Sequence, residues 1–285
     1  MKKSVVTIGT FDGVHKGHRF LIKQTLLAAQ KDNLRSVVVA LEKPFRAVRG
    51  LLSLRDEKIK ELATLGVDEI VILEVPSEIL SNEPEEFFNK FLIKFLNAEK
   101  IVCGADFAFG KDRKGNAAWL KKQKSVKVNI VKPLKISDRQ VSSSQIRKLL
   151  EEADVAKANK LLGRNYSFSG MPFKDRGVGK KMGFPTVNLK VDAGKLLPKG
   201  IFISLIEQNG KIYPSVTSIG NRPTFKAGNH TVPETHILGF RGEWKNAKTT
   251  VSLLKKLRAE KKFKNVSDLK TQISKDIEKA NKYFK

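Results

Sequence analysis

Near its N-terminus the chain reads Gly9-Thr10-Phe11-Asp12-Gly13-Val14-His15-Lys16-Gly17-His18, a turn punctuated by three glycines. A β-branched apolar segment, residues 5–8, precedes the turn, and an amphipathic segment, residues 20–27, follows it. This order predicts a strand that leads through the turn into a helix. Unpaired backbone N–H groups and the helix dipole attract phosphate at such a place. The sequence therefore predicts a phosphate-binding turn.

Two histidines stand in this turn. His15 and His18 are three residues apart, so near a helix start they lie on one face. There they are suited to donating hydrogen bonds to phosphate oxygens as charge develops, and Asp12 is suited to holding the turn or orienting a histidine. The alternative is that the histidines only cap the helix or fill space. The chain has four histidines in all, and two of them in one turn favour the functional interpretation.

Apolar segments alternate with helical periodicity in the first part of the chain. They are residues 5–8, 36–41, 69–75, 100–104 and 126–131. Near-continuous apolar strands that alternate with helices predict a Rossmann-like α/β domain, with a parallel sheet covered on both faces. Ligands bind at the carboxyl ends of the strands in such sheets. The histidine turn lies at such an end.

Two further segments fall on the same edge of the predicted sheet. Residues 104–110 follow the fourth strand, and residues 141–147 follow the fifth. Their polar and aromatic candidates are Asp106, Phe107, Ser142, Ser143, Ser144 and Arg147. Helix capping alone explains one of the three serines. Hydroxyls at a helix start, with an arginine one turn later, also suit the β- and γ-phosphates of a nucleotide.

The same patterns predict three details of the helices. Ser53 is expected to cap a helix whose apolar stripe lies within residues 59–63. Pro84 is expected to open a helix that turns its phenylalanines, up to Phe95, inward. Ser267 is expected to cap the last helix of the chain.

The pattern changes near residue 163, where strands and turns replace the alternation of strands with helices. The expected strands are residues 167–169, 201–206, 211–216, 235–238 and 249–254. Short strands of this kind predict an antiparallel barrel or sandwich, here followed by a C-terminal helix. We therefore expect two domains, residues 1–163 and residues 164–285.

The composition indicates a globular enzyme. The 285 residues are 40% hydrophobic and 29% charged, which excludes a disordered chain. No apolar run approaches the ~20 residues that span a bilayer, and the N-terminus lacks the pattern of a signal peptide. The single cysteine, Cys103, excludes an internal disulfide and is expected to be a buried strand thiol. These features predict a cytoplasmic protein with no membrane partner.

The net charge of +26 raises the question of nucleic-acid binding. The sequence shows no helix-turn-helix, no zinc site and no aromatic ladder among its lysines. We therefore expect anionic small-molecule substrates, no specific nucleic acid, and a monomer or weak homo-oligomer. A basic RNA-binding protein on a decayed enzyme scaffold is kept as an alternative of a different class.

A second glycine-rich segment lies in the second domain. Residues 177–189 hold three glycines and two lysines before Pro185-Thr186-Val187-Asn188. Such a loop is suited to wrapping phosphate with backbone N–H groups, while a threonine hydroxyl and an asparagine carbonyl suit Mg²⁺. It does not match the P-loop pattern, and from these residues alone an ordinary glycine-rich hairpin is the simpler interpretation.

The histidine turn resembles that of the HxGH nucleotidyltransferases, and in particular their flavin branch. Residues 183–189, 220–225, 234–238 and 257–263 resemble the riboflavin kinase domain in order and spacing. Together these motifs make the whole chain similar to bacterial bifunctional riboflavin kinase/FAD synthetases. The resemblance implies that a β-barrel phosphorylates riboflavin to FMN with ATP and Mg²⁺. It also implies that the N-terminal domain adenylylates FMN to FAD with a second ATP and releases pyrophosphate.

The resemblance implies roles for particular residues. It makes Glu234 the general base of the kinase, although a solvated strand carboxylate is the plain alternative for this residue. It makes His15 and His18 the groups that stabilise the α-phosphate. The implied ATP-binding residues of the adenylyltransferase are Gly9, Phe11, Asp12, Gly17, Ser142, Ser143, Ser144 and Arg147, with Asp106 and Phe107 lining the nucleotide or flavin pocket. Those of the kinase are Gly177, Gly179, Gly183, Pro185, Thr186 and Asn188, with Thr186 and Asn188 also holding Mg²⁺ and Arg258 binding flavin.

The chain departs from the family pattern at several positions. Thr10 stands where asparagine is usual, Ser144 stands where threonine is usual, and residues 41–45 keep only one proline. In the kinase domain Lys174-Asp175 replaces a His-Gly pair, and Trp244-Lys245 replaces a Tyr-Gly pair. Two alternatives remain open: an enzyme with both activities, or one that retains a single activity, in the first instance the kinase.

Overall fold

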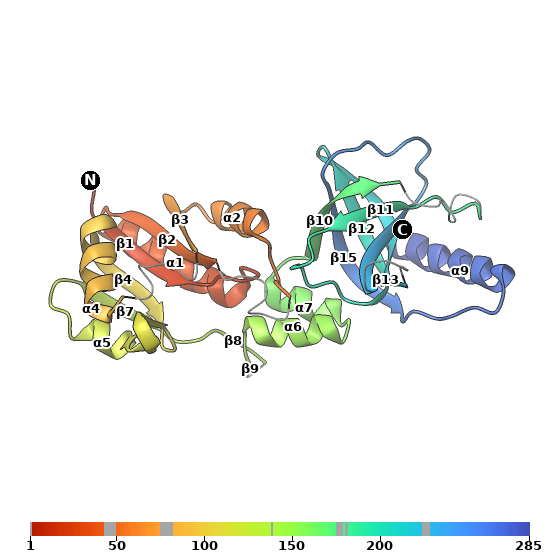
Figure 1. Cartoon of the computed structure of the whole chain (residues 1–285). Coiled ribbons are helices and arrows are strands. Elements are labelled where there is room, and N and C mark those ends of the chain that lie inside the picture. Colours follow the sequence, from red (N-terminus) through yellow and green to blue (C-terminus); the bar gives the residue numbers. More distant parts are fainter. Residues whose placement is uncertain are drawn as a thin grey trace. The chain divides into compact units, whose positions relative to one another are not determined.

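A computed structural model describes residues 2–42, 50–74, 82–137, 139–174, 179, 182–223 and 229–285. The chain forms two compact units, Met1–Ser143 and Ser144–Lys285 (Figure 1). Each unit is described separately below. None of the described helices combines the length and the apolar character that crossing a bilayer requires.

The first unit is built on a parallel five-stranded sheet with the order β3-β2-β1-β4-β7. Its strands are β1 (Ser4–Gly9), β2 (Arg35–Glu42), β3 (Glu69–Glu74), β4 (Ala98–Gly104) and β7 (Lys127–Val131). All five agree in place with the predicted strands. The central strand β1 pairs with β2 on one side and with β4 on the other, so the turn after Gly9 leaves the middle of the carboxyl edge. The prediction of a Rossmann-like parallel sheet is confirmed.

Helices lie on both faces of this sheet, as predicted. They are α1 (Lys16–Lys31), α2 (Arg55–Ala63), α4 (Pro84–Glu86), η2 (Phe87–Phe95) and α5 (Ala117–Lys121), with the short segments β5 (Ala108–Phe109), η3 (Lys111–Arg113), β6 (Gly115–Asn116), β8 (Lys135–Ile136) and β9 (Arg139–Gln140). The side chains of alternate residues of β2 point to opposite faces of the sheet. Val37 and Val39 pack with Phe87 and Phe91 on one side, while Val38 packs with residues of α1 and α2 on the other.

Two predicted helix caps are wrong. The N-cap of α2 is Leu54 rather than Ser53, because the Ser53 hydroxyl instead accepts a hydrogen bond from the backbone N–H of Gly13 at 2.9 Å. The last helix, α9 (Val266–Phe284), is capped by Asn265 rather than Ser267, and the Asn265 side chain accepts from Asp268 N at 2.8 Å. In both cases the predicted serine lies close to the helix start, but tertiary contacts or local geometry make another residue the N-cap.

The helix that follows Pro84 also differs from prediction at its end. Phe87 and Phe91 are buried as expected, but Phe95 is 59% exposed. Residues 87–95 form a π-helix, whose i→i+5 hydrogen bonds lengthen each turn. The 3.6-residue period of an α-helix therefore predicts the buried face incorrectly at Phe95, the last residue of this helix.

The second unit holds a closed antiparallel barrel with the strand order β10-β11-β14-β13-β12-β15. The strands are β10 (Tyr166–Phe173), β11 (Val187–Val191), β12 (Gly200–Gln208), β13 (Lys211–Pro223), β14 (Asn229–Ile237) and β15 (Thr249–Arg258). The predicted barrel with a C-terminal helix is confirmed. Strand β11, which follows Pro185 and Thr186, was not among the predicted strands, since its glycine-rich flank resembles a loop.

A chain of hydroxyl groups runs through the barrel interior. Ser204 Oγ lies 2.8 Å from Ser215 Oγ and 2.7 Å from Thr217 Oγ1, and Thr217 Oγ1 lies 2.9 Å from Thr235 Oγ1. All four side chains are fully buried. Because buried hydroxyls are costly unless they are paired, this chain fixes how β12, β13 and β14 pack around one another.

Helices α6 (Ser143–Glu151) and α7 (Val155–Leu162) precede the barrel, and from Ser144 onward they belong to the second unit. Asn159 on α7 donates to Leu253 O at 2.9 Å and accepts from Tyr166 N at 2.7 Å. These contacts bind α7 to the first and last strands of the barrel. The predicted functional boundary after residue 163 stays a prediction about which residues each activity needs.

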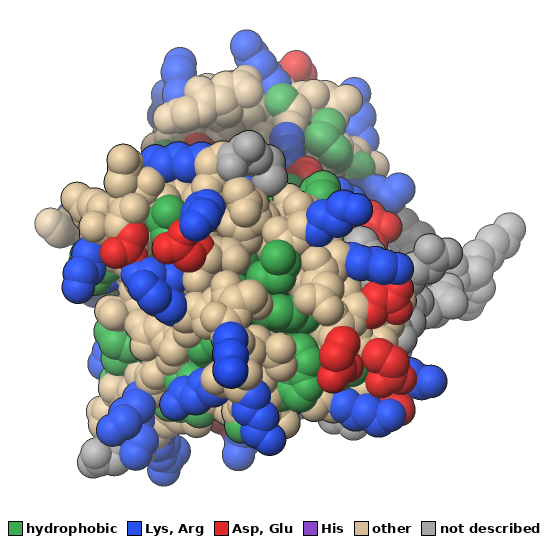
Figure 2. Space-filling model, turned by 90° about the vertical axis from the view of Figure 1, so that its left-hand side faces the viewer, with side chains coloured by type: hydrophobic (Ala, Val, Ile, Leu, Met, Phe, Trp, Pro, Cys, Tyr) green, Lys and Arg blue, Asp and Glu red, His purple; other side chains and the backbone are tan. Residues whose placement is uncertain are grey.

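Charged side chains are spread over the surface rather than gathered in one patch on the face that Figure 2 shows. Lys and Arg side chains stand at many separate places on that face, with fewer Asp and Glu between them and apolar side chains exposed among them. The net charge of the chain is +26. A distributed field of this kind attracts small anions in general.

An ion pair with a buried carboxylate joins the C-terminal helix to the barrel. Arg258, the last residue of β15, donates from Nε to Asp276 Oδ2 at 2.9 Å and from Nη2 to the same oxygen at 2.8 Å. Asp276 lies on α9 and is 2% exposed. Gln272, one turn earlier on α9, donates to Asp276 Oδ1 at 3.0 Å.

Asp276→Ala is expected to lower the free energy of unfolding of the second unit by about 3 kcal/mol, because it leaves a partly buried guanidinium without its carboxylate. The measurement is urea denaturation followed by the fluorescence of Trp244 in a Trp119→Phe background. Glu278→Gln, which breaks an exposed pair with Lys282 on the same helix, is the control and should leave the transition in place. Equal transitions for the two variants would contradict the structural importance of the Arg258–Asp276 pair.

Candidate active sites

The two histidines of the turn form a stacked pair. His15 is the N-cap residue of α1, and its Nδ1 accepts a hydrogen bond from the backbone N–H of His18 at 3.3 Å. The ring centroids are 3.6 Å apart with an interplanar angle of 16°. Since Nδ1 of His15 is an acceptor, the neutral ring carries its proton on Nε2. His15 is thereby held as an Nε2–H donor.

The backbone of the turn is held in unusual conformations. Phe11, Gly13 and Val14 have φ values of 45°, 81° and 38°, in the left-handed region. This region is costly for a β-branched residue such as Val14, and such strain persists only where the surroundings impose it. Phe11 is 1% exposed, and its ring meets His18 edge-on at 5.3 Å. Packing of the Phe11 ring therefore helps to fix the position of His18.

Gly17 allows the start of α1 to approach the His15 ring. A Cβ at this position would lie 3.1 Å from His15 Cε1 and 3.3 Å from the carbonyl oxygen of Val141. Both distances are tighter than ordinary contacts, so a side chain here would displace either the catalytic candidate or the backbone beside the serine segment. The lack of a side chain at Gly17 therefore permits this close approach.

Asp12 faces inward and does not line the pocket described below. It is 5% exposed, and its carboxylate accepts hydrogen bonds from Ser53 N at 3.0 Å and Leu52 N at 3.3 Å. Its carbonyl oxygen accepts from Ser143 Oγ at 2.9 Å. Of the two possibilities for Asp12, holding the turn and orienting a histidine, these contacts favour the first.

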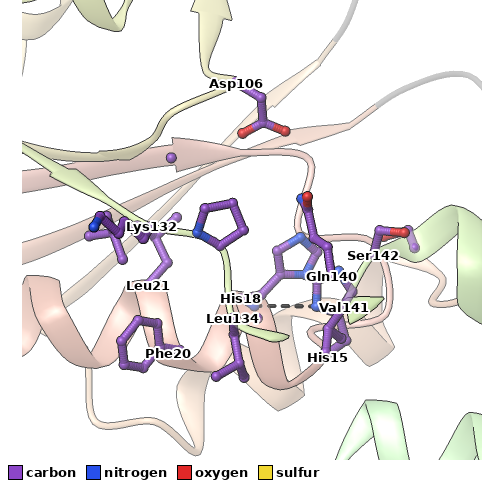
Figure 3. A pocket seen from close by; sticks show the side chains of 15 residues that line it. His15, His18, Phe20, Leu21, Asp106, Lys132, Leu134, Gln140, Val141 and Ser142 are labelled. Atoms are coloured by element: carbon purple, nitrogen blue, oxygen red, sulfur yellow. Dashed lines mark hydrogen bonds between the residues drawn. The ribbon is translucent and has the colours of Figure 1, made fainter. Parts of the chain in front are cut away.

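A pocket of about 250 Å³ opens at the carboxyl edge of the parallel sheet (Figure 3). It brings together six of the predicted site residues, which come from three separate segments: His15, Gly17, His18, Asp106, Ser142 and Ser143. Pockets for small ligands span roughly 300–1,000 Å³, so this one encloses only part of a nucleotide. Phe11 and Asp12 are buried behind the turn, and Phe107 stacks on Phe109 at 5.5 Å.

Besides Phe11, Asp12 and Phe107, three further predicted residues do not line the pocket. Gly9 ends β1, and the ring of Phe11 packs over its Cα. Ser144 and Arg147 lie on α6 and belong to the second unit. Their predicted contacts with the triphosphate therefore stay predictions.

The pocket also contains residues that the sequence analysis missed. Figure 3 shows Phe20 and Leu21 of α1 at one end with Lys132, whereas the histidines, Gln140 and Ser142 are grouped at the other. Lys132 follows β7 directly, at the same sheet edge as the histidine turn. Ligands bind at the carboxyl ends of parallel strands, so the position of Lys132 directly after the fifth predicted strand could have identified it as a site residue.

The electrostatics of the pocket favour neutral His18. Burial lowers the pKa of His18 well below its usual range, and the neighbouring His15 and Lys58 lower it further. Lys58 lies on α2, where its Nζ is 2.8 Å from the Glu42 carboxylate. Nδ1 of His18 is buried and has no hydrogen-bond partner among the described residues. At neutral pH the His18 ring is therefore uncharged.

In the second unit, two predicted kinase residues are direct neighbours. Asn188 on β11 is the register partner of Glu234 on β14, and Glu234 is also the register partner of Ser218 on β13. Directly opposed residues on antiparallel strands have Cβ atoms about 5 Å apart on one side of the sheet. Asn188 is 8% exposed, whereas Glu234 is partly exposed. The candidate metal ligand and the candidate base thus share one face of the barrel.

Two glycines of the segment before β11 meet steric or conformational requirements. A Cβ on Gly179 would lie 2.6 Å from Phe184 O and 3.2 Å from Thr186 Oγ1, so only glycine fits there. Gly183 has a φ of 90°, which also suits glycine. Gly177 and Asp175 lie outside the described residues, as do Lys43-Pro44-Phe45 of the first unit.

His236 is a residue near this site that the sequence analysis did not single out. Its Nδ1 lies 2.9 Å from the carbonyl oxygen of Pro185, and its ring meets that of Phe184 edge-on at 6.1 Å. His236 stands two residues after Glu234, and hence on the same face of β14. It links the strand of the candidate base to the loop that carries Thr186.

Arg258 and Trp244 have defined structural partners. The Arg258 guanidinium binds Asp276, as described above, and its Nη1 donates to Ala259 O at 3.0 Å. Trp244, which departs from the family pattern, packs with Tyr213 and Phe240 and donates from Nε1 to Thr249 Oγ1 at 3.0 Å. The barrel therefore accommodates this departure without leaving the indole N–H unpaired.

His18 should make the first unit less stable in acid. Its pKa in the folded state is lowered, so below the usual histidine pKa of about 6.5 the unfolded chain binds a proton that the folded chain does not. Stability is therefore full above that pH and is lost as the pH falls. Between pH 7.5 and 5.5 we expect the wild type to lose about 1 kcal/mol more than His18→Asn. Urea denaturation followed by Trp119 fluorescence in a Trp244→Phe background measures this, and equal losses would contradict it.

Comparison with known proteins identifies a family for each unit. The family model described as FAD synthetase matches residues 1–145, and the one described as riboflavin kinase matches residues 162–284. A bifunctional riboflavin kinase/FMN adenylyltransferase of Buchnera aphidicola subsp. Schizaphis graminum is 34% identical, over 99% of this chain and 94% of that protein. The protein of the same description from Bacillus subtilis is 31% identical, over 99% and 93%.

A solved structure is similar over almost the whole chain. The crystal structure described as a macrolide-efflux protein from Streptococcus pneumoniae has a TM-score of 0.90 and 31% identity, and the match covers 98% of this chain and 94% of that one. Its description concerns transport, whereas the family models and the curated relatives agree on flavin chemistry. The fold has the parallel sheet with a histidine turn and the six-stranded barrel with an Asn188–Glu234 pair, and the relatives match over nearly the whole chain. The chain therefore belongs to the bifunctional riboflavin kinase/FMN adenylyltransferase family.

Proposed function

We propose that this enzyme makes FAD in two steps, with the pocket of the first unit as the adenylyltransferase site and the Asn188–Glu234 face of the barrel as the kinase site. Riboflavin and ATP give FMN and ADP at the barrel. FMN and a second ATP give FAD and pyrophosphate at the pocket. The observation that carries the first assignment is the stacked His15–His18 pair at the carboxyl edge of the sheet.

In the adenylyltransferase step, an oxygen of the FMN phosphate forms a bond to the α-phosphorus of ATP, and the bond from that phosphorus to the β-phosphate oxygen breaks. Negative charge grows on the α-phosphate oxygens. His15, held as an Nε2–H donor by the backbone of His18, donates to one of them. His18, kept neutral, contributes a second polar contact at the same group.

The remaining candidates of the first step surround this centre. Ser142 and Ser143 line the pocket and bind the β- and γ-phosphates, with Ser144 and Arg147 of α6 completing the set. Asp106 and Phe107 serve the nucleotide or flavin end. Gly9, Phe11, Asp12 and Gly17 contribute by shaping the turn rather than by side-chain contact.

In the kinase step, the 5′-hydroxyl oxygen of riboflavin attacks the γ-phosphorus, ADP leaves, and Glu234 accepts the hydroxyl proton. A loose phosphoryl transfer depends on positioning more than on base strength. The register of Glu234 with Asn188 supports this assignment, because the proposed base and the proposed Mg²⁺-ATP ligand are cross-strand neighbours. The glycine loop, with Gly177, Gly179, Gly183 and Pro185, wraps the phosphates.

The donor set beside Glu234 fits Mg²⁺. Thr186 offers a hydroxyl and Asn188 an amide carbonyl, and both are hard oxygen ligands. No group of three or more His, Cys, Asp or Glu in the described part of the chain could hold a metal by itself. An ion held here would take its other ligands from ATP and water, and would neutralise charge on the transferred phosphoryl group.

Arg258 is proposed to serve the flavin end of the kinase site indirectly. Its guanidinium is engaged by Asp276, and this pair fixes the end of β15 against α9. Outside the two sites, the proposal includes a cytoplasmic location, a monomer or weak homo-oligomer, and no specific nucleic-acid partner.

An enzyme with a single activity is the second candidate, and the departures at Lys174-Asp175 and in residues 41–45 motivate it. Riboflavin with radiolabelled ATP, followed by separation of FMN and FAD, tests the proposal. Formation of both products supports it. FMN without FAD, when FMN is also supplied directly, leaves a kinase alone. Salt-sensitive RNA binding without any flavin product would favour the RNA-binding alternative.

Glu234→Gln is expected to lower kcat for FMN formation by roughly 10²–10⁴-fold, because the amide keeps the shape but cannot accept the proton. FAD formation from supplied FMN should stay unchanged. Glu207→Gln on β12, which alters another partly buried strand carboxylate of the same barrel, is the matched control and should retain kinase activity. Kinase turnover by Glu234→Gln at the wild-type rate would show that Glu234 is not the base.

Replacing His15 and His18 with Ala is expected to have the opposite effect. FAD formation from FMN should fall by about 10²-fold or more, because hydrogen-bond donors to the developing charge are lost. FMN formation on the same chain serves as the internal control and should continue. An undiminished rate of FAD formation would rule out the histidine turn as the adenylyl-transfer site.

A further inference from the structure

Ser53 reaches the histidine turn from a distant part of the chain. It lies just before α2, 40 residues after Gly13, and is 1% exposed. Its hydroxyl accepts a hydrogen bond from Gly13 N at 2.9 Å, and its own N–H donates to Asp12 Oδ1 at 3.0 Å. The hydroxyl also lies 3.5 Å from the same carboxylate oxygen.

These contacts act on the most strained part of the turn. Gly13 and Val14 both have positive φ values, and a strained backbone of this kind is stable only when its surroundings hold it. Ser53 holds the turn at Gly13, directly before Val14 and His15. Ser143 binds the carbonyl oxygen of Asp12 at 2.9 Å from another side. The turn is thus fixed from two separate segments.

We propose that Ser53 is a positioning residue of the adenylyltransferase site. It does not line the pocket, so it acts on the reaction only through the turn that carries His15 and His18. By fixing Gly13 N–H and the Asp12 carboxylate, it sets the direction in which the two histidine rings enter the pocket. The inference rests on the proposed role of these histidines in adenylyl transfer.

A second serine in the same unit provides a matched control. Ser36 is also 1% exposed, and both its N–H and its hydroxyl donate to the Asp68 carboxylate at 2.7 Å. Its hydroxyl accepts from a backbone N–H, that of Asp68, at 3.0 Å. The pattern of hydrogen bonds matches that of Ser53, but Ser36 lies at the start of β2, at the opposite edge of the sheet from the histidine turn.

The experiment compares Ser53→Ala with Ser36→Ala in the full chain. Both variants lose the same kind of hydrogen bonds, so both should lower the Tm of the first unit. Only Ser53→Ala should lower kcat for FAD formation from FMN, on the order of 10- to 100-fold, because misplaced catalytic groups reduce the rate of the chemical step. The KM for ATP should change by less than about twofold, since the lost effect is confined to the transition state. FMN formation from riboflavin should be unchanged.

NMR chemical shifts of the histidines distinguish a change in ring position from a general loss of stability. The chain has four histidines, so the ring Cε1–H signals of His15 and His18 can be assigned by substitution. These two signals should shift in Ser53→Ala and stay in place in Ser36→Ala. Equal kcat values for the two serine variants, or unshifted histidine signals, would overturn the proposal.

Ser53→Cys is a second variant that tests the proposal if Ser53→Ala does not fold. The thiol fills the space of the hydroxyl and is a weak hydrogen-bond partner, so it should also lower kcat and shift the histidine signals. If both Ser53 variants fail to fold while Ser36→Ala folds, Ser53 is needed for folding and the positioning role is overturned. A wild-type enzyme that forms no FAD would instead contradict the proposed function itself.

Discussion

The pairing of β1 between β2 and β4 is the constraint on which the first site depends. Because all three strands are parallel, the turn after Gly9 emerges at the middle of the carboxyl edge, where loops from neighbouring strands also emerge. The Asp106 segment after β4 and the loop after β7 therefore reach the same pocket as His15 and His18. Burial of Val6 and Ile8 on one face of β1 holds this strand in place.

In the barrel, register has the corresponding role. Strand β14 pairs with both β11 and β13, so Glu234 is placed beside Asn188 on one side and Ser218 on the other. The buried hydroxyl chain from Ser215 to Thr235 fixes this register from inside, because a slip by one residue would bury unpaired groups. The polar interior thus fixes the register of the strand that carries the candidate base.

Both sites use the same physical strategy. In each, a glycine allows a backbone to approach closely, Gly17 at the His15 ring and Gly179 at Thr186. A strand end holds the candidate histidines, and a register pair holds the candidate carboxylate. Positioning of this kind suits the proposed phosphoryl and adenylyl transfers, where charge already resides on the substrates.

The sequence by itself determined the two-part architecture, the strands of the parallel sheet and the motifs of both sites, because these follow from local periodicity and from short runs such as 9–18 and 183–189. The predictions from the sequence were wrong for the helix caps at Ser53 and Ser267 and for the inward direction of Phe95. They used residue type and helical period, which do not reveal competing hydrogen-bond partners or a π-helix. Only the tertiary structure decided that Ser53 binds the turn, that Asn188 opposes Glu234, and that Lys132 enters the pocket. Each of these depends on contacts between residues distant along the chain, which local propensity does not encode.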